Sequence, residues 1–133
     1  MIHPVIRPSH DTNLAKSFYL CLTESFKLLV DMIIFNTTYH ADNARKDEFI
    51  GWLKESYIPT VLEHGLLQDP QLTRIFADNE EEGTSLSLQF KSPDTQALER
   101  WHEECGEALL AEMQKRFGDQ VLGFSTLLEV IDL

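Results

Sequence analysis

The sequence predicts an α+β fold, a ferredoxin-like βαββαβ sandwich whose antiparallel sheet has the strand order 4-1-3-2. Two stretches, 32–40 and 85–90, alternate apolar and polar residues with the period of two that is typical of strands. Two others, 43–64 and 92–117, repeat apolar residues at the three- and four-residue spacing of amphipathic helices. The order of these elements along the chain is that of a split βαβ unit.

Composition limits the classes of function. The 133 residues suffice for one domain, and the formal net charge is -11. Of the 22 acidic and 11 basic residues, three of each lie in residues 1–31, so the acidic excess belongs to residues 32–133. Such an acidic domain lacks the lysines and arginines that displace counterions from phosphates. Neither nucleic acid nor an anionic membrane is therefore an expected partner.

Cys21 and Cys105 lie far apart and belong to no Cys-x-x-Cys pair or Cys/His cluster at metal spacing. We expect no metal site and no cofactor, and a reducing cytoplasm is the simplest location. The apolar run 17–23 is too short to cross a bilayer and lacks the features of a signal peptide.

Residues 1–31 differ from the rest of the chain, since they are neutral and open with two prolines. Apolar residues then recur at helical spacing: Leu14, Phe18, Leu22 and Phe26. One interpretation is a peripheral helix, the rest being disordered. The other, which we favour, is an N-terminal extension upstream of a native start at Met32. The domain proper is expected to span residues 32–133.

The stretch 32–40 is expected to be the first, central strand, followed by a helix that Asp42 or Asn43 caps. That helix should kink at Pro59 and end at Gly65 in a left-handed conformation. A second strand is expected over 72–77. The charged segment 78–83 is interpreted as a solvated hairpin tip rather than a cation site.

The third strand, 85–90, leads to a helix for which Ser92 is the expected N-cap. Its buried stripe consists of Leu98, Trp101, Cys105, Leu109 and Met113. Gly106 within this helix suggests that another group packs closely there. The last strand is expected over 121–131, with four apolar residues on one face: Leu122, Phe124, Leu128 and Val130.

Right-handed crossovers place the first and third strands in the middle of the sheet, with both helices on one face. The side chains expected beneath the helices are Ile33, Phe35, Tyr39, Leu86, Leu88 and Phe90. The other face is expected to be polar at its centre, with Asn36, Thr38, His40, Ser85, Ser87 and Gln89. Its expected apolar margin consists of Ile34, Ile75, Leu127 and Ile131.

A sheet face that is polar in the middle and apolar around it favours partial cover by a second copy of the chain. We therefore expect a homodimer that packs sheet to sheet and leaves a polar cavity between its subunits. The six central polar residues would bind a small molecule in that cavity.

Four segments together resemble a bacterial domain-of-unknown-function family of about one hundred residues. They are MIIFNTTYH (32–40), YIPTVL (57–62), LERW (98–101) and RFGDQVLGFSTLL (116–128). The resemblance covers residues 32–133, and residues 1–31 depart from it. It implies the build of the dimeric α/β barrels, whose relatives include small monooxygenases, isomerases and ligand-binding proteins, but it implies no catalytic residues.

His40 is the candidate general base, since Asp42 is close enough in sequence to orient its imidazole. The alternative is a strand-end histidine bonded to a backbone carbonyl. Trp52 and Trp101 are expected in the core, and Cys105 is expected to be inert packing. His64 and His102 are expected in solvent.

Three classes of function follow from these residues. A small-molecule-binding homodimer ranks first. A cofactor-independent enzyme of monooxygenase or isomerase type, with His40 as its base, is the alternative. The third class is an interaction protein that acts through its acidic surface.

Overall fold

The computed structural model describes residues 32–76 and 80–133, so the predicted N-terminal extension lies outside the described residues. The strands are β1 (Ile33–Ala41), β2 (Gln68–Ile75), β3 (Thr84–Ser92) and β4 (Val121–Glu129). The first helical segment joins α2 (Lys46–Trp52), η1 (Leu53–Tyr57) and α3 (Ile58–His64). The second joins α4 (Thr95–Trp101), η3 (His102–Gly106), α5 (Glu107–Phe117) and η4 (Gly118–Gln120), and η2 (Glu80–Glu82) precedes β3.

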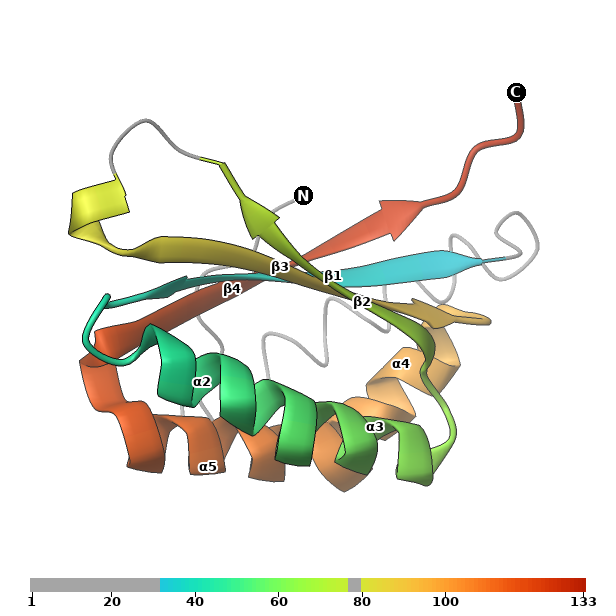
Figure 1. Ribbon diagram of the computed structural model, residues 1–133. Coiled ribbons are helices and arrows are strands. Elements are labelled where there is room, and N and C mark those ends of the chain that lie inside the picture. The colour runs from blue at the N-terminus through green and yellow to red at the C-terminus, as the bar shows by residue number, and fades with distance from the viewer. Residues whose placement is uncertain (1–31, 77–79) are drawn as a thin grey trace.

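The four strands form one antiparallel sheet in the order β2-β3-β1-β4, which is the predicted order read from the other edge. Both long helical segments lie beneath one face of this sheet (Figure 1). The opposite face, called the open face below, has neither of them on it. The predicted ferredoxin-like α+β sandwich is therefore confirmed. Within the described residues, no helix is both long and apolar enough to cross a bilayer.

The core lies between the sheet and the helices. All six strand residues predicted there are at most 4% exposed: Ile33, Phe35, Tyr39, Leu86, Leu88 and Phe90. Phe49 of α2 is fully buried and packs edge-on against Tyr39 and Phe117, with ring centroids 5.0 and 5.3 Å apart. Such edge-to-face aromatic pairs stabilise a fold beyond the apolar area that they bury. Trp52 and Trp101 are also buried, as predicted.

Each helical segment contains one wide π turn. In η1 the amide of Ile58 donates to the carbonyl of Leu53, and in η3 the amide of Glu107 donates to that of His102. Pro59 is the second residue of α3, just after η1; proline cannot donate a backbone hydrogen bond, and the wide turn lets the helix continue past it. The segment then ends at Gly65 in a left-handed conformation with φ 94°, as predicted.

The predicted cap of the first helix is wrong. The N-cap is Arg45, whose side chain does not cap the helix. Asn43 instead binds the neighbouring hairpin, because its amide donates to the carbonyl of Glu81 and its side-chain oxygen accepts from Thr84. Asp42 precedes the cap by three residues and is exposed.

The predicted cap of the second helix is also wrong. Ser92 is the last residue of β3, and its hydroxyl donates to the carbonyl of Asp94 at 2.7 Å. Asp94 is the N-cap, since its carboxylate accepts from the amide of Ala97 at 2.7 Å. The second strand begins four residues earlier than expected, because Asp69, at φ 54°, and a bulge before Gln71 accommodate the proline between them.

The last strand turns the opposite way from the prediction. β4 pairs with β1 so that Tyr39 is opposite Gly123 and Phe35 is opposite Leu127. Leu127 therefore packs toward the helices, not on the open face. The open face instead receives the residues one position along: Leu122, Phe124 and Leu128. Ile131 lies beyond the end of the strand.

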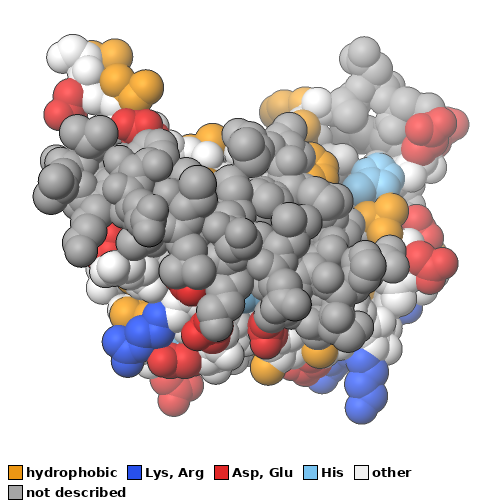
Figure 2. Space-filling view, turned by 180° about the vertical axis from the view of Figure 1, so that it is seen from behind, with side chains coloured by type: hydrophobic (Ala, Val, Ile, Leu, Met, Phe, Trp, Pro, Cys, Tyr) orange, Lys and Arg blue, Asp and Glu red, His pale blue; other side chains and the backbone are white. Residues whose placement is uncertain are grey.

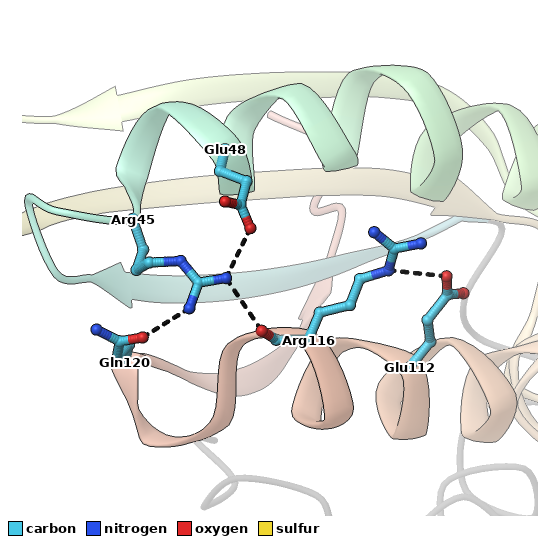
Figure 3. A network of polar contacts seen from close by, with 5 residues as sticks. All are labelled: Arg45, Glu48, Glu112, Arg116 and Gln120. Carbon is cyan, nitrogen blue, oxygen red and sulfur yellow. Dashed lines mark hydrogen bonds and ion pairs between the residues drawn. The ribbon is translucent and has the colours of Figure 1, made fainter.

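Arg45 clamps the two helical segments together at one end (Figure 3). Its Nη1 donates to Gln120 at 2.6 Å, and its Nη2 donates to Glu48 at 2.6 Å and to the carbonyl of Arg116 at 3.0 Å. The guanidinium also lies over the Phe117 ring, 4.8 Å from its centroid. Among the described residues, the side chain of Arg116 pairs with Glu112, one turn away on the exposed face of α5.

We predict that Arg45→Ala lowers the free energy of unfolding by about 1–3 kcal/mol, because charge-assisted hydrogen bonds and packing are lost together. Arg116→Ala is the matched control and should change it by about 0.5 kcal/mol or less, since its backbone carbonyl remains. Urea denaturation followed by circular dichroism measures both. Equal effects of the two substitutions would contradict the clamp.

Candidate functional site

The six polar residues predicted to bind a ligand lie together on the open face. β1 and β3 pair so that Asn36, Thr38 and His40 lie opposite Gln89, Ser87 and Ser85. Several of these residues also bind each other. The Asn36 amide donates to Thr38 at 3.2 Å and accepts from the Ser87 hydroxyl at 2.5 Å. Their use as ligand-binding residues remains a prediction.

His40 is exposed, and both of its ring nitrogens have partners. Nε2 lies 3.0 Å from the carbonyl oxygen of Glu82, and this nitrogen is the donor, since a carbonyl only accepts. In the neutral ring Nδ1 then accepts from the Ser85 hydroxyl, 3.1 Å away. The backbone carbonyl, rather than the expected Asp42, orients the ring. Its use as a general base remains a prediction.

The margin of the open face is apolar. Exposed fractions are 51% for Leu122, 40% for Ile75 and 38% for Leu128, and Ile34 lies opposite Leu128. Figure 2 shows basic side chains in the lower half of the molecule, over the helical layer, and hydrophobic side chains along the upper edge. Isolated surface leucines are ordinary, but an apolar margin around a polar centre is typical of a surface that another molecule covers.

A second candidate site, which the sequence analysis did not identify, lies on the helix side of the sheet. It is a partly enclosed cavity of about 50 Å³ between β1, β4 and the second helical segment. On this measure a single water molecule needs about 10–15 Å³. The cavity is lined by Phe35, Thr37, Tyr39, Tyr57, Trp101, His102, Gly106, Leu110, Met113, Gly123, Phe124 and Ser125. We call it the helix-side pocket.

Hydroxyl groups form a continuous row along the sheet side of this pocket. Tyr39 makes side-chain hydrogen bonds with Tyr57 and Thr37, and the Thr37 hydroxyl lies 3.3 Å from that of Ser125. Burial raises the pKa of Tyr39 to about 12, against the opposing effect of those hydrogen bonds. Tyr39 is therefore a neutral phenol at every physiological pH, able to donate or accept a hydrogen bond.

Two glycines let aromatic rings pack closely along the walls of this pocket. A Cβ atom at Gly123 would lie 2.9 Å from the Tyr39 ring, and one at Gly106 would lie 2.8 Å from the Trp101 ring. The close packing expected at Gly106 is therefore confirmed. The π turns also contribute, since η1 ends at Tyr57 and η3 contains both His102 and Gly106. Such turns occur frequently at functional sites.

His102 was expected in solvent, and this expectation is wrong. It is 5% exposed and lines the pocket, because the extra residue of the π turn directs both Trp101 and His102 inward. Its Nε2 lies 3.7 Å from the Glu107 carboxylate. Burial lowers the pKa of His102, while Glu107 and then Glu103 act in the opposite direction. His64 is half-buried and lies 3.0 Å from Glu104, on the outer surface.

Metal-binding geometry is not observed at either site. Within residues 32–76 and 80–133, no three His, Cys, Asp or Glu side chains gather as a metal site would require. At the hairpin tip, Glu81 and Glu82 are exposed, as expected for a loop in water. Cys105 is buried, and burial raises the pKa of its thiol, so it is not an activated nucleophile.

Sequence comparison matches residues 32–131 to the family described as a domain of unknown function, DUF4286. The chain belongs to this family. The match covers the whole sandwich, including both candidate sites, and begins at Met32, where the resemblance in the sequence also begins. Among curated proteins, no sequence matches significantly.

Solved structures of similar fold include three bacterial or environmental proteins. An ethyl tert-butyl ether d (EthD) family protein from Bacillus halodurans C-125 is 18% identical with a TM-score of 0.59, covering 75% of this chain and 99% of its own. A candidate antibiotic biosynthesis monooxygenase from Bacillus cereus is 12% identical with a TM-score of 0.53, covering 77% and 95%. A dimeric ferredoxin-like protein from an uncultured marine organism is 12% identical with a TM-score of 0.55, covering 77% and 97%. At these identities the likeness concerns the fold alone.

Burial of His102 predicts a loss of stability in acid. Its pKa in the folded state lies below its ordinary value of 6.5, so the unfolded state binds the proton more readily. The stability that the neutral His102 ring contributes is complete above pH 6.5 and is lost as pH falls toward the folded-state pKa. Over that range the free energy of unfolding decreases by no more than about 1.4 kcal/mol per pH unit.

Denaturation of wild type and His102→Gln at pH 7.5 and pH 5.5 measures this contribution. The difference in unfolding free energy between the two pH values should be smaller in the variant. An unchanged difference would show that His102 does not titrate on unfolding.

Proposed function

We propose that this protein is a homodimer that binds a small, largely apolar molecule with at least one oxygen atom, and that the ligand occupies the helix-side pocket. The observation that carries the proposal is a partly enclosed cavity. Aromatic rings form its walls, and a row of buried hydroxyl groups lines one side. Apolar walls with a few polar groups are the usual chemistry of small-molecule sites.

The apolar walls and the polar groups of the pocket would contact different parts of the ligand. Phe35 and Trp101 pack with their ring centroids 5.4 Å apart and form an apolar wall suited to a short aliphatic chain. Thr37 and Ser125 offer hydroxyl groups at the pocket floor. A ligand lacking an oxygen would cover these hydroxyls without offering them a further hydrogen-bond partner, which lowers affinity.

The open face is proposed as the dimer interface. Its central polar side chains already bind one another, so covering them with a second copy leaves few groups unsatisfied. Its apolar margin supplies the surface that an interface buries. One structural neighbour is described as a dimeric ferredoxin-like protein, which supports the same arrangement here. A ligand held between the two sheets by Asn36 and Gln89 is the alternative location.

Chemical-shift changes that a ligand induces in the full-length protein test which location is used. Wild-type protein labelled with ¹⁵N is titrated with a library of small aliphatic alcohols and ketones. Bound compounds should move the indole resonance of Trp101, which lines the pocket, and the amides of Gly106 and Gly123. The indole of Trp52, which is buried but does not line the pocket, is the internal control and should not move. Shifts confined to Asn36 and Gln89 would contradict the helix-side location.

The dimer is tested with a matched pair of leucines. Leu122 on the open face is 51% exposed, and Leu62 on the outer side of α3 is 43% exposed. We expect wild type and Leu62→Asp to sediment as dimers and Leu122→Asp to sediment as a monomer, because a buried unpaired carboxylate opposes association. A monomeric wild type, or a dimer that tolerates Leu122→Asp, would contradict this interface.

A further inference from the structure

We propose that the outer edge of β4 pairs antiparallel with β4 of a second copy, so that two four-stranded sheets join side by side into one. The edge is a different surface from the open face, so this inference goes beyond the proposed function and does not depend on it. One copy can use both surfaces, and edge pairing then joins two open-face dimers at high protein concentration.

β4 is an edge strand that lacks the features which usually keep a sheet edge from pairing. Among residues 32–76 and 80–133, it pairs with β1 alone. Its residues 121–128 include no proline and no charged side chain, and the whole strand follows β1 in one continuous register. A sheet edge that is long, regular and apolar is a site where another strand can add.

β2, at the opposite edge of the sheet, has several of these protective features. Pro70 has no N–H group to donate, and a bulge between Gln68 and Gln71 interrupts the register with β3. Asp69 has a φ of 54° and pairs with Lys91. Proline, charge and bulges are the means by which natural edge strands avoid pairing. Of the two edges of the described sheet, β4 alone is regular, so a two-fold pair of β4 strands leaves no similar edge from which a fibre could grow.

The hydrogen bonds at the two ends of the β1–β4 pair show which backbone groups of β4 point outward. At one end the amide of Val130 donates to the carbonyl of Met32 at 3.4 Å. At the other end the amide of Asp42 donates to the carbonyl of Gln120 at 2.9 Å. Antiparallel partners exchange hydrogen bonds at every second position, so the even-numbered residues of β4 bond to β1. The residues whose N–H and C=O groups point to the free edge are Val121, Gly123, Ser125, Leu127 and Glu129.

The sequence of β4 is complementary to itself in the antiparallel orientation. Ser125 is the middle residue of the strand, so a two-fold axis beside it pairs the whole of one strand with the other, outward groups facing outward groups. On the open face, Leu122 then lies opposite Leu128 of the second copy. On the helix side, Gly123 lies opposite Leu127 of the second copy. Cross-strand pairs of this kind stabilise a sheet, and the first of them covers two leucines that are 51% and 38% exposed.

Disulfide formation in the full chain tests this register, with Leu122→Cys and Leu128→Cys introduced together. In the proposed pair these positions face each other without a hydrogen bond between them, and their Cα atoms are about 4.5 Å apart, within the span of a disulfide. Under mild oxidation the double variant should migrate mostly as a covalent dimer in electrophoresis without reductant. Wild type, which retains Cys21 and Cys105, should not.

Each single variant is a matched control. In Leu122→Cys alone, the substituted positions of the two copies are offset along the paired strands by the distance from 122 to 128, about 20 Å, and the same offset applies to Leu128→Cys. Neither should cross-link. Sheets packed face to face are about 10 Å apart, too far for a disulfide, so an open-face dimer does not give the link. A double variant that stays uncrosslinked, or a single variant that cross-links equally, overturns the inference.

Hydrogen exchange of the wild-type chain gives a second test that needs no substitution. The amides of Gly123, Ser125 and Leu127 should exchange about tenfold more slowly at high than at low protein concentration, because pairing gives them acceptors. The amides of Phe124 and Thr126, which bond to β1 in either state, are the internal control and should be slow at both concentrations. Outward amides that are slow at both concentrations would show an edge covered within one copy. Outward amides that are fast at both would show an edge that stays free, and either result overturns the inference.

Discussion

The contact between Tyr39 and Gly123, across the β1–β4 pair, determines the character of both faces of the sheet. The Tyr39 ring occupies the place where a Cβ atom of residue 123 would be, so glycine is required on the helix side of β4 at this point. Because side chains alternate along a strand, this one requirement sends Ser125 toward the helices and Leu122 and Phe124 to the open face. A strand with the opposite orientation would direct Leu122, Phe124 and Leu128 toward the helices, where these side chains would fill the pocket.

The two faces consequently differ in how their polar groups are satisfied. On the open face the polar side chains bind one another or the backbone, as His40 does with Ser85 and the carbonyl of Glu82. Because these polar groups already have hydrogen-bond partners, the open face is suited to burial against another protein surface. On the helix side the hydroxyl row and the buried His102 line a cavity. That arrangement leaves polar groups available to a ligand in a setting where electrostatic interactions are strong.

The helices contribute to the pocket through their irregular turns. Each π turn adds one residue to its segment, and in η3 this brings His102 onto the buried side beside Trp101. Arg45 holds the far ends of the two segments together, through Gln120 and the carbonyl of Arg116. The helices are thus fixed by a polar clamp at one end and by aromatic packing along their length. The pocket occupies the region of β1 and β4 under the second segment, where Gly123 and Gly106 pack closely against the rings of Tyr39 and Trp101.

Much of this molecule is determined by the sequence alone. The period-two pattern of β1 and β3, the helical stripes and the order of the elements were sufficient for the sandwich, its strand order and the buried side of both central strands. The six polar residues of the open face were also identified correctly as a group, since alternation places them there without any further information. Only the tertiary structure decided the orientation of β4, because both of its faces carry apolar residues and hydrophobicity cannot choose between them. The inward position of His102 was decided in the same way, since a π turn inserts one residue into a helical period that the sequence does not mark. The helix-side pocket depends on both of these features, and for that physical reason it could not be predicted from the sequence.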